Sequence, residues 1–205
     1  MFGFDRGKPI DRYYIEDFLK KYRADIRGRV LEIGDRQYTA FGEGRVTHSE
    51  VLHAVSGNPK ATLVGDLATG VGIPKRTFDC MILTQTLPFI YPVKEAIHQI
   101  KNALLPGGVA LVTVPGISQI SRHDMELWGD YWRFTDASVK RLFSDVFGPE
   151  NLTVITYGNV AAACAFLYGL ASHELKEHEL AYNDPNYQLI IGVRATRPLD
   201  GANGE

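Results

Sequence analysis

The chain has 205 residues, of which 45% are hydrophobic and 22% are charged, the balance of a globular protein with one buried core. The formal net charge is −2 and the charges are interleaved, which disfavours a nucleic-acid partner because phosphate binding needs clustered basic residues. No apolar run reaches the ~18 residues that span a bilayer, and residues 1–10 lack the apolar core of an export signal. We therefore expect a cytoplasmic protein without a membrane span, in which Cys80 and Cys164 are buried thiols.

Helices and strands are predicted to alternate along the chain. Helical spacing of apolar residues after a possible N-cap at Asp11 predicts a helix over 11–22. In chain order we then expect strands over 29–33, 45–52, 61–64 and 78–83, a helix over 93–104, a strand over 109–114, a helix over 136–147, a strand over 152–157, a helix over 160–175 and a strand over 187–195. Strands that are apolar on both faces and alternate with helices indicate an α/β fold, a Rossmann-like doubly wound sheet. The predicted organisation is one domain over 1–198 and a flexible tail over 199–205.

The first predicted strand, Val-Leu-Glu-Ile at 30–33, ends at Gly34. A glycine there allows a tight turn and a close approach of the backbone to a ligand, or simply ends a buried strand. The dinucleotide fingerprint needs further glycines, but Asp, Arg, Gln and Tyr occupy residues 35–38. This replacement disfavours NAD and FAD, whose pyrophosphate requires that loop.

S-adenosylmethionine (SAM) has no phosphate, and it needs acids near its amino group and ribose and an apolar slot for adenine. Glu32 can serve the amino group, Glu50 the ribose hydroxyls, and Asp66 with Leu67 the adenine. Each acid can instead be a turn or cap residue. Their positions at the ends of successive predicted strands favour the cofactor interpretation.

Four segments together, Val-Leu-Glu-Ile-Gly at 30–34, Val-Gly-Asp-Leu at 64–67, the strand at 78–83 and Leu-Leu-Pro-Gly-Gly at 104–108, resemble class I SAM-dependent methyltransferases of the type 11 kind. The resemblance implies a seven-stranded sheet whose last strand is antiparallel, with SAM at Glu32, Gly34, Glu50, Asp66 and Gln85. The chain departs from the family pattern because no further glycine follows Gly34 before Gly42. Side chains of residues 35–39, Asp35 and Tyr38 among them, can contact the methionine moiety instead.

The segment 117–135 has little periodicity and is rich in groups that bind ligands. Its sequence at 128–135, Trp-Gly-Asp-Tyr-Trp-Arg-Phe-Thr, resembles a bacterial branch of these methyltransferases that is found near, or fused to, glycosyltransferases. The acceptor-binding candidates are Trp128, Asp130, Tyr131, Trp132 and Arg133. His123 and Asp124 are the candidates for the base that removes a proton from a hydroxyl acceptor. Alternatively, the aromatic residues clamp the segment to the sheet, and Arg133 pairs with Asp130 or Asp124.

These observations favour a SAM-dependent methyltransferase that O-methylates a sugar or a glycosylated small molecule. A second hypothesis is an inactive methyltransferase fold that serves as a binding or scaffold module beside a glycosyltransferase partner, and the missing glycines favour it. A nicotinamide-dependent oxidoreductase is the third. No metal site is expected, because His173 and His178 are five residues apart and do not share a helix face as an i, i+4 pair would.

Overall fold

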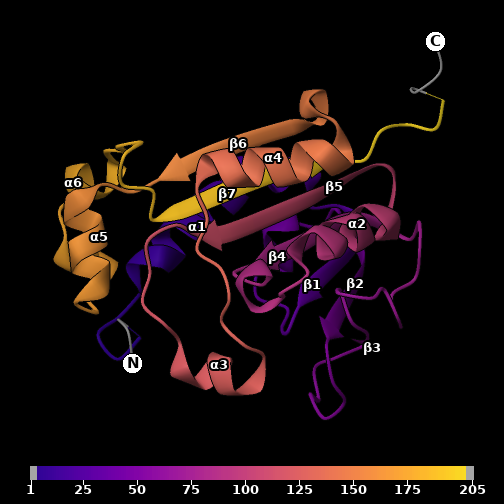
Figure 1. Ribbon diagram of the computed structural model, residues 1–205, viewed down its shortest axis with the longest axis horizontal. Coiled ribbons are helices and arrows are strands. Elements are labelled where there is room, and N and C mark those ends of the chain that lie inside the picture. Colours follow the sequence, from indigo (N-terminus) through magenta and orange to yellow (C-terminus); the bar gives the residue numbers. More distant parts are fainter. Residues whose placement is uncertain (1–3, 202–205) are drawn as a thin grey trace.

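A seven-stranded sheet with helices on both faces organises the computed structural model, which describes residues 4–201 (Figure 1). The strands are β1 (Gly28–Ile33), β2 (Val46–His53), β3 (Leu63–Val64), β4 (Phe78–Thr84), β5 (Leu104–Pro115), β6 (Leu152–Tyr157) and β7 (Ile190–Thr196). Their order is β3-β2-β1-β4-β5-β7-β6, with β1 to β5 parallel and β7 antiparallel to both of its neighbours. The predicted fold class, including the antiparallel last strand, is confirmed.

Two hydrophobic clusters cover the two faces of the sheet. The helices are α1 (Ile10–Lys21), α2 (Val93–Ala103), α3 (Arg122–Leu127), α4 (Asp136–Phe147), α5 (Val160–Leu167) and α6 (Glu177–Ala181). Leu31 packs in the cluster with α2 and α4, whereas the adjacent Val30 packs in the cluster with α1 and α5. Successive strand residues point to opposite faces, so a strand that is apolar throughout is buried on both sides.

The connections among the first four strands contain no α-helix. A short 3-10 turn, Thr39–Gly42, lies between β1 and β2, while residues 54–62 and 65–77 form loops. Parallel strands usually return through a helix, so this half of the sheet is covered by less structure than the half around β4 and β5. The loops leave the carboxyl ends of β1 and β2 accessible.

Several boundaries differ from the prediction. Helix α5 ends at Leu167 because Gly169 adopts a left-handed conformation with φ of +75°, which terminates a helix. Strand β5 begins at Leu104, before the Pro-Gly-Gly turn, and its register against β4 shifts between Phe78 and Cys80. The expectation that both cysteines are buried is wrong for Cys164, which is exposed on α5.

The structure describes only the first part of the tail predicted over residues 199–205. Residues 199–201 are described, and Asp200 forms an ion pair with Arg76. Residues 202–205 of the expected tail lie outside the described residues. In the described part of the chain, no helix is both long and apolar enough to cross a membrane.

Candidate functional site

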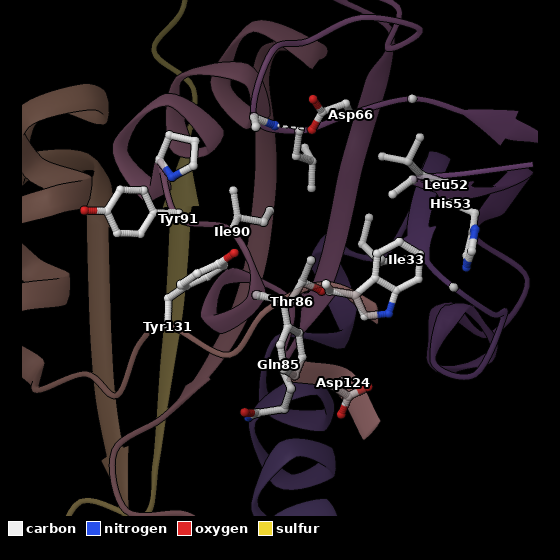
Figure 2. Close-up of a pocket in the computed structure, with 18 of the residues that line it drawn as sticks. Ile33, Leu52, His53, Asp66, Gln85, Thr86, Ile90, Tyr91, Asp124 and Tyr131 are labelled. Carbon is white, nitrogen blue, oxygen red and sulfur yellow. Dashed lines mark hydrogen bonds between the residues drawn. The ribbon is translucent and has the colours of Figure 1, made fainter. Parts of the chain in front are cut away.

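A cavity of about 580 Å³ opens at the carboxyl ends of β1, β2 and β4 (Figure 2). Strand order reverses at β1, which lies between β2 and β4, and open α/β sheets bind ligands at such a reversal. The walls of this cavity include Ile33, Gly34, Leu52, His53, Asp66, Leu67, Thr84, Gln85, Ile90, Tyr91, Asp124, Trp128 and Tyr131. The segment that contains α3 therefore lies across the cavity from the strand ends.

A second cavity of about 360 Å³ adjoins the first. The two cavities share Thr84, Gln85, Phe89 and Asp124. The start of α1 also lines the second cavity, and its remaining walls are Phe4, Pro88, Pro115, Ile117, Ser118, Gln119, Ser121, Asp130, Arg133, Phe166 and Ile190. The two cavities therefore have a common wall, to which Gln85 and Asp124 belong.

Chain segments far apart in sequence hold the start of α1 against the second cavity. Pro9 forms an isolated antiparallel bridge with Ala171, and the Ser172 N–H donates to the Lys8 carbonyl at 2.7 Å. The Tyr14 hydroxyl, which is buried, donates to the Leu180 carbonyl at 3.0 Å. These contacts fix α1 to the segment around α5 and α6.

Gly34 presents bare backbone to the larger cavity. Its φ is +78°, and a Cβ built on it would meet no atom within 4 Å. The Gly34 N–H donates to the Leu52 carbonyl at 3.0 Å, and its own carbonyl accepts from Asn58. The expected close approach of backbone to a ligand is therefore sterically open at this residue.

Glu32 lines neither cavity, because its side chain turns into the protein. The carboxylate accepts hydrogen bonds from the backbone N–H groups of Gln37, Tyr38 and Thr39 and from the Thr39 hydroxyl, at 2.9 to 3.1 Å. Burial raises the pKa of Glu32, and these hydrogen bonds oppose the shift. Glu32 thus fixes the conformation of the loop that follows β1.

The side chains of that loop also point away from both cavities. Asp35 is exposed and pairs with Lys60 at 2.7 Å. Tyr38 is buried, and its hydroxyl accepts a hydrogen bond of 2.6 Å from Arg12. The structure therefore does not bring Asp35 or Tyr38 to the walls where we expected a cofactor.

Glu50 lies in the interior of β2, opposite Leu31 of β1, and lines neither cavity. Its two carboxylate oxygens accept hydrogen bonds from Arg29 at 2.8 Å and from the Thr62 hydroxyl at 2.6 Å. These two donors lower the pKa of Glu50. The last residue of β2, which does reach the larger cavity, is His53.

Asp66 and Leu67, the pair predicted to contact adenine, both lie on the wall of the larger cavity. The Asp66 carboxylate accepts from the Ala68 N–H at 2.7 Å and from the Thr69 hydroxyl at 2.9 Å, which leaves lone pairs for a ligand. Among the described residues, no group accepts a hydrogen bond from the Leu67 N–H. The pair offers an acceptor and a donor side by side.

Gln85 lies in the wall that the two cavities share and has an unusual backbone conformation. Its φ of +52° is unusual for a residue other than glycine, and its N–H donates to the Thr113 carbonyl at 2.9 Å. Such conformations cluster at functional sites, where the surrounding structure holds them. The side-chain amide of Gln85 also donates to the Thr113 hydroxyl at 3.5 Å.

Helix α3 carries the two candidate bases in different environments. Asp124 lines both cavities and accepts a hydrogen bond of 2.6 Å from the hydroxyl of Ser121, the N-cap of α3. His123 is exposed and lines neither cavity. Of the two candidate bases, Asp124 is therefore the one that lies in the cavity walls.

The aromatic residues of the acceptor segment divide between the larger cavity and the core. Trp128 lines the larger cavity and contacts His53 edge-to-face, with ring centroids 5.6 Å apart. Tyr131 lines it as well and packs edge-on against Tyr91. Trp132 lines neither cavity, since it stacks on Tyr91 and donates from its indole nitrogen to the Ile90 carbonyl at 3.1 Å. Trp132 therefore clamps the segment to the protein.

Asp130 and Arg133 form an ion pair in the wall of the second cavity. Arg133 donates to both oxygens of the Asp130 carboxylate, at 2.6 and 2.9 Å, and the Asp130 side chain is only 2% exposed. This guanidinium lowers the pKa of Asp130. The pair supports the alternative interpretation, in which these residues fix the segment.

The contribution of α1 to the second cavity was not among the predictions. Asp11 is not the N-cap, which is Pro9, but lies in the first turn and lines the cavity together with Arg12. Burial raises the pKa of Asp11. Within residues 4–201, the Nε of Arg12 and the Oε1 of Gln119 are buried without a hydrogen-bond partner, and both residues line this cavity. No local pattern links α1 to residue 119, so only the fold could bring them together.

No protein-family model and no curated protein sequence matches the chain. Solved structures do match its fold. Phosphoethanolamine N-methyltransferase 2 of Haemonchus contortus, in complex with phosphomonomethylethanolamine and S-adenosylhomocysteine, matches with a TM-score of 0.60 and 14% identity over 91% of this chain and 52% of that one. The chain thus spans about half the length of that protein.

Two further structures match over most of both chains. N-methyltransferase NodS of Bradyrhizobium japonicum WM9, in complex with S-adenosylhomocysteine, has a TM-score of 0.56 and 13% identity over 94% of this chain and 89% of that one. A SAM-dependent methyltransferase of Archaeoglobus fulgidus has a TM-score of 0.58 and 11% identity over 91% and 94%. The chain therefore has the Rossmann-like fold of SAM-dependent methyltransferases.

Proposed function

We propose that this protein is a SAM-dependent methyltransferase that takes the cofactor in the larger cavity and the acceptor in the second. The observation that carries the proposal is the wall of Gln85 and Asp124 shared by two cavities at the carboxyl edge of the sheet. Methyl transfer is an in-line displacement, so it needs donor and acceptor side by side in fixed orientation. Two adjoining cavities of unequal size meet that requirement.

The donor set of the larger cavity fits SAM. Asp66 can accept a hydrogen bond from the adenine amino group, and the free Leu67 N–H can donate to a ring nitrogen. The bare backbone at Gly34 leaves room for the methionine portion. A volume of about 580 Å³ lies within the range of small-molecule sites. When bound, SAM supplies a methyl group on a positively charged sulfur.

The second cavity combines groups that suit a sugar or a glycosylated small molecule. Asp11, Asp124 and Gln119 can accept hydrogen bonds from hydroxyl groups, and Phe4 and Phe89 supply apolar surface. A sugar has apolar faces and a rim of hydroxyls, so such a mixture complements it. Asp124 can take the proton from an acceptor hydroxyl, the role of a general base. We therefore propose O-methylation of a sugar hydroxyl.

Calorimetric titration with SAM, S-adenosylhomocysteine and NAD tests the cofactor assignment. We expect micromolar binding of the first two and none of NAD. Mass spectrometry of mixtures with SAM and a panel of sugars, glycosylated small molecules and primary amines then tests the acceptor. A mass gain of one methyl only on the amines would reject the sugar proposal and keep the methyltransferase.

A second candidate function is a binding module without catalysis, beside a glycosyltransferase. The observation that favours it is the loop after β1. The Glu32 carboxylate accepts hydrogen bonds from the backbone N–H groups of residues 37–39, and no side chain of residues 35–39 lines the larger cavity. The same fold also occurs in the [4+2]-cyclase SpnF, which matches with a TM-score of 0.55 and 13% identity over 89% of this chain and 81% of that one. Failure of either SAM compound to bind would favour this candidate.

A further inference from the structure

Two arginines contribute guanidinium groups to the walls of the second cavity, and they differ in their partners. Arg133 holds the carboxylate of Asp130 and also donates to three backbone carbonyls. Arg12 forms no ion pair with any residue of 4–201, and its Nη1 donates to an uncharged group, the Tyr38 hydroxyl, at 2.6 Å. The positive charge of Arg12 therefore lacks a carboxylate partner in the described part of the chain.

The free part of Arg12 is one edge of its planar guanidinium. The Nε is buried without a hydrogen-bond partner, and within residues 4–201 nothing accepts from Nη2 either. These two nitrogens carry parallel N–H bonds on the same side of the group, and an anion with two oxygens can accept from both. Arg29 also has a buried, unpartnered Nε, but its Nη2 donates to Glu50 and it lines neither cavity.

The same edge binds carboxylates elsewhere in this protein. Arg194 donates from Nε and Nη2 to the two carboxylate oxygens of Asp25, at 2.8 and 3.0 Å. Arg6 holds Glu174 through the same two nitrogens. Bidentate pairs of this kind combine charge with a fixed geometry, which makes them both strong and specific. A ligand carboxylate at Arg12 would repeat an arrangement that the chain uses twice within itself.

The guanidinium of Arg12 is also oriented before a ligand binds. The Phe4 ring lies over it, with the guanidinium carbon 5.9 Å from the ring centroid, and the Tyr38 hydroxyl holds its Nη1. A donor pair fixed by two neighbours loses little freedom when a ligand binds, which favours recognition.

The acids of the second cavity oppose an anion only in part. Of the three, Asp130 is already paired with Arg133. Burial raises the pKa of Asp11, which favours its uncharged form. Asp124 belongs to the wall shared with the larger cavity. The cavity can therefore accept a negative group at Arg12 while Asp124 remains the base.

We propose that the acceptor carries a carboxylate, which the Nε and Nη2 groups of Arg12 hold bidentately, and that the acceptor is therefore a sugar acid such as a hexuronate. This inference rests on the proposed function and deepens it, because it assumes that the second cavity binds the acceptor. The Oε1 of Gln119, which is buried and lacks a partner among residues 4–201, can accept a hydrogen bond from a hydroxyl of the same ligand.

The test is calorimetric titration of the protein saturated with S-adenosylhomocysteine. The probes are D-glucuronate and D-galacturonate, each beside its neutral primary amide, and D-glucose 6-phosphate, which offers a phosphate instead. The variants are Arg12→Gln, which has no guanidinium, and Arg12→Lys, which keeps the charge without the paired N–H groups. Arg122→Gln is the control, since Arg122 is exposed on α3 and lines neither cavity.

We expect one hexuronate to bind the unaltered protein about 10- to 100-fold more tightly than its amide, the effect of hydrogen bonds to a charged group. Arg12→Gln should reduce the affinity for the hexuronate to that for the amide, and Arg12→Lys should give an intermediate value. The affinity for the amide itself should stay the same in both variants, which shows that the cavity is still folded. Arg122→Gln should change each affinity by less than about twofold, as for an exposed charge.

Several results would overturn the inference. If both hexuronates bind no more tightly than their amides, or if none of these sugars binds, the carboxylate site is rejected. A preference for glucose 6-phosphate that Arg12→Gln removes would assign the edge to a phosphate. An equal loss in Arg122→Gln would indicate a general effect of charge. If the unaltered protein binds no S-adenosylhomocysteine, the proposed function itself fails, and this outcome is measured before any sugar is added.

Discussion

The Thr39 hydroxyl donates a hydrogen bond of 2.9 Å to the carboxylate of Glu32, a group at the end of β1 that is only 3% exposed. Three backbone N–H groups donate to the same carboxylate, so one side chain folds residues 37–39 back onto the strand. The loop after β1 is therefore shaped by a buried acid and not by a series of glycines.

Glu32→Gln should destabilise the protein by about 2 to 3 kcal/mol, because the amide nitrogen is a donor that faces backbone donors and leaves at least one of them unpaired. Urea denaturation measures the effect as a lower midpoint. Glu43→Gln is the control, since Glu43 is exposed and its pair with Arg23 contributes little. Equal midpoints for the two variants would contradict the assigned role.

Gly34→Ala and Gly44→Ala form a matched pair for the cavity. Both glycines have φ near +80° and open space where a Cβ would stand, so each substitution should cost about 1 kcal/mol of stability. Only the methyl group added at residue 34 would lie beside the larger cavity, because Gly44 does not line it. We expect S-adenosylhomocysteine affinity to fall about tenfold in Gly34→Ala and to stay unchanged in Gly44→Ala, as measured by calorimetry.

Asp124→Asn should lower kcat about 100-fold or more, because the amide cannot take the proton of an acceptor hydroxyl. Asparagine retains the oxygen that the Ser121 hydroxyl contacts, so α3 should keep its N-cap geometry. The neighbouring substitution His123→Ala is the control, and it should leave kcat within about twofold because His123 is exposed. A large effect of His123→Ala with none at Asp124 would reverse the assignment.

Protonation of Asp130 should break its ion pair with Arg133 and change the structure of this segment at acidic pH. The folded-state pKa of Asp130 is lowered from 3.8, so the pair stabilises the folded segment above that pH, and the contribution is lost as the pH falls through the lowered value. Both tryptophans of the protein lie at 128 and 132 in the sequence, so intrinsic fluorescence reports on this segment. We expect an emission change below pH 3.8.

Asp130→Asn tests this origin of the acid transition. At neutral pH its emission should already resemble that of the unaltered protein in acid, because the amide carries no charge for Arg133. If the variant shows the same acid transition as the unaltered protein, another group is responsible.

Thr135→Ala should destabilise α4 by about 1 kcal/mol, because Thr135 is the N-cap and exchanges hydrogen bonds with Ser138 in a capping box. Thr135→Ser retains the hydroxyl and should fall within a few tenths of a kcal/mol of the unaltered protein. Thermal denaturation compares the two variants. Equal losses would indicate that the methyl group of Thr135, and not its hydroxyl, stabilises the helix end.

The sheet could be predicted because its strands are apolar on both faces, as in 78–83 and 109–114, and because turn residues separate them. The antiparallel direction of β7 came from the family resemblance, since hydrophobic pattern alone does not give strand direction. Helix α3 was missed because none of its residues is buried, which removes the periodic signal. The only local sign was Ser121 followed three residues later by Asp124, an N-terminal capping pattern.

The predicted cofactor residues that reach a cavity are ones that local sequence places after a strand. Gly34, Asp66 and Leu67 were predicted from such positions and Gln85 from the family resemblance, and all four line the larger cavity. Glu50 was assigned to the ribose because it lies near a strand end, but its partners Arg29 and Thr62 belong to other segments, and sequence does not reveal such pairing. His53 and Asp11 escaped notice for the same reason, since tertiary packing alone brings them to the cavities.

The bridge between Pro9 and Ala171 has a consequence for the order in which the protein assembles. The larger cavity is built from residues 33–131, whereas the second closes only when the start of the chain meets a segment more than 160 positions later. Contacts so distant in sequence form slowly, because a long loop must be closed first. During synthesis on the ribosome, all residues that line the larger cavity therefore emerge before the residues around Ala171 that hold the start of the chain against the second.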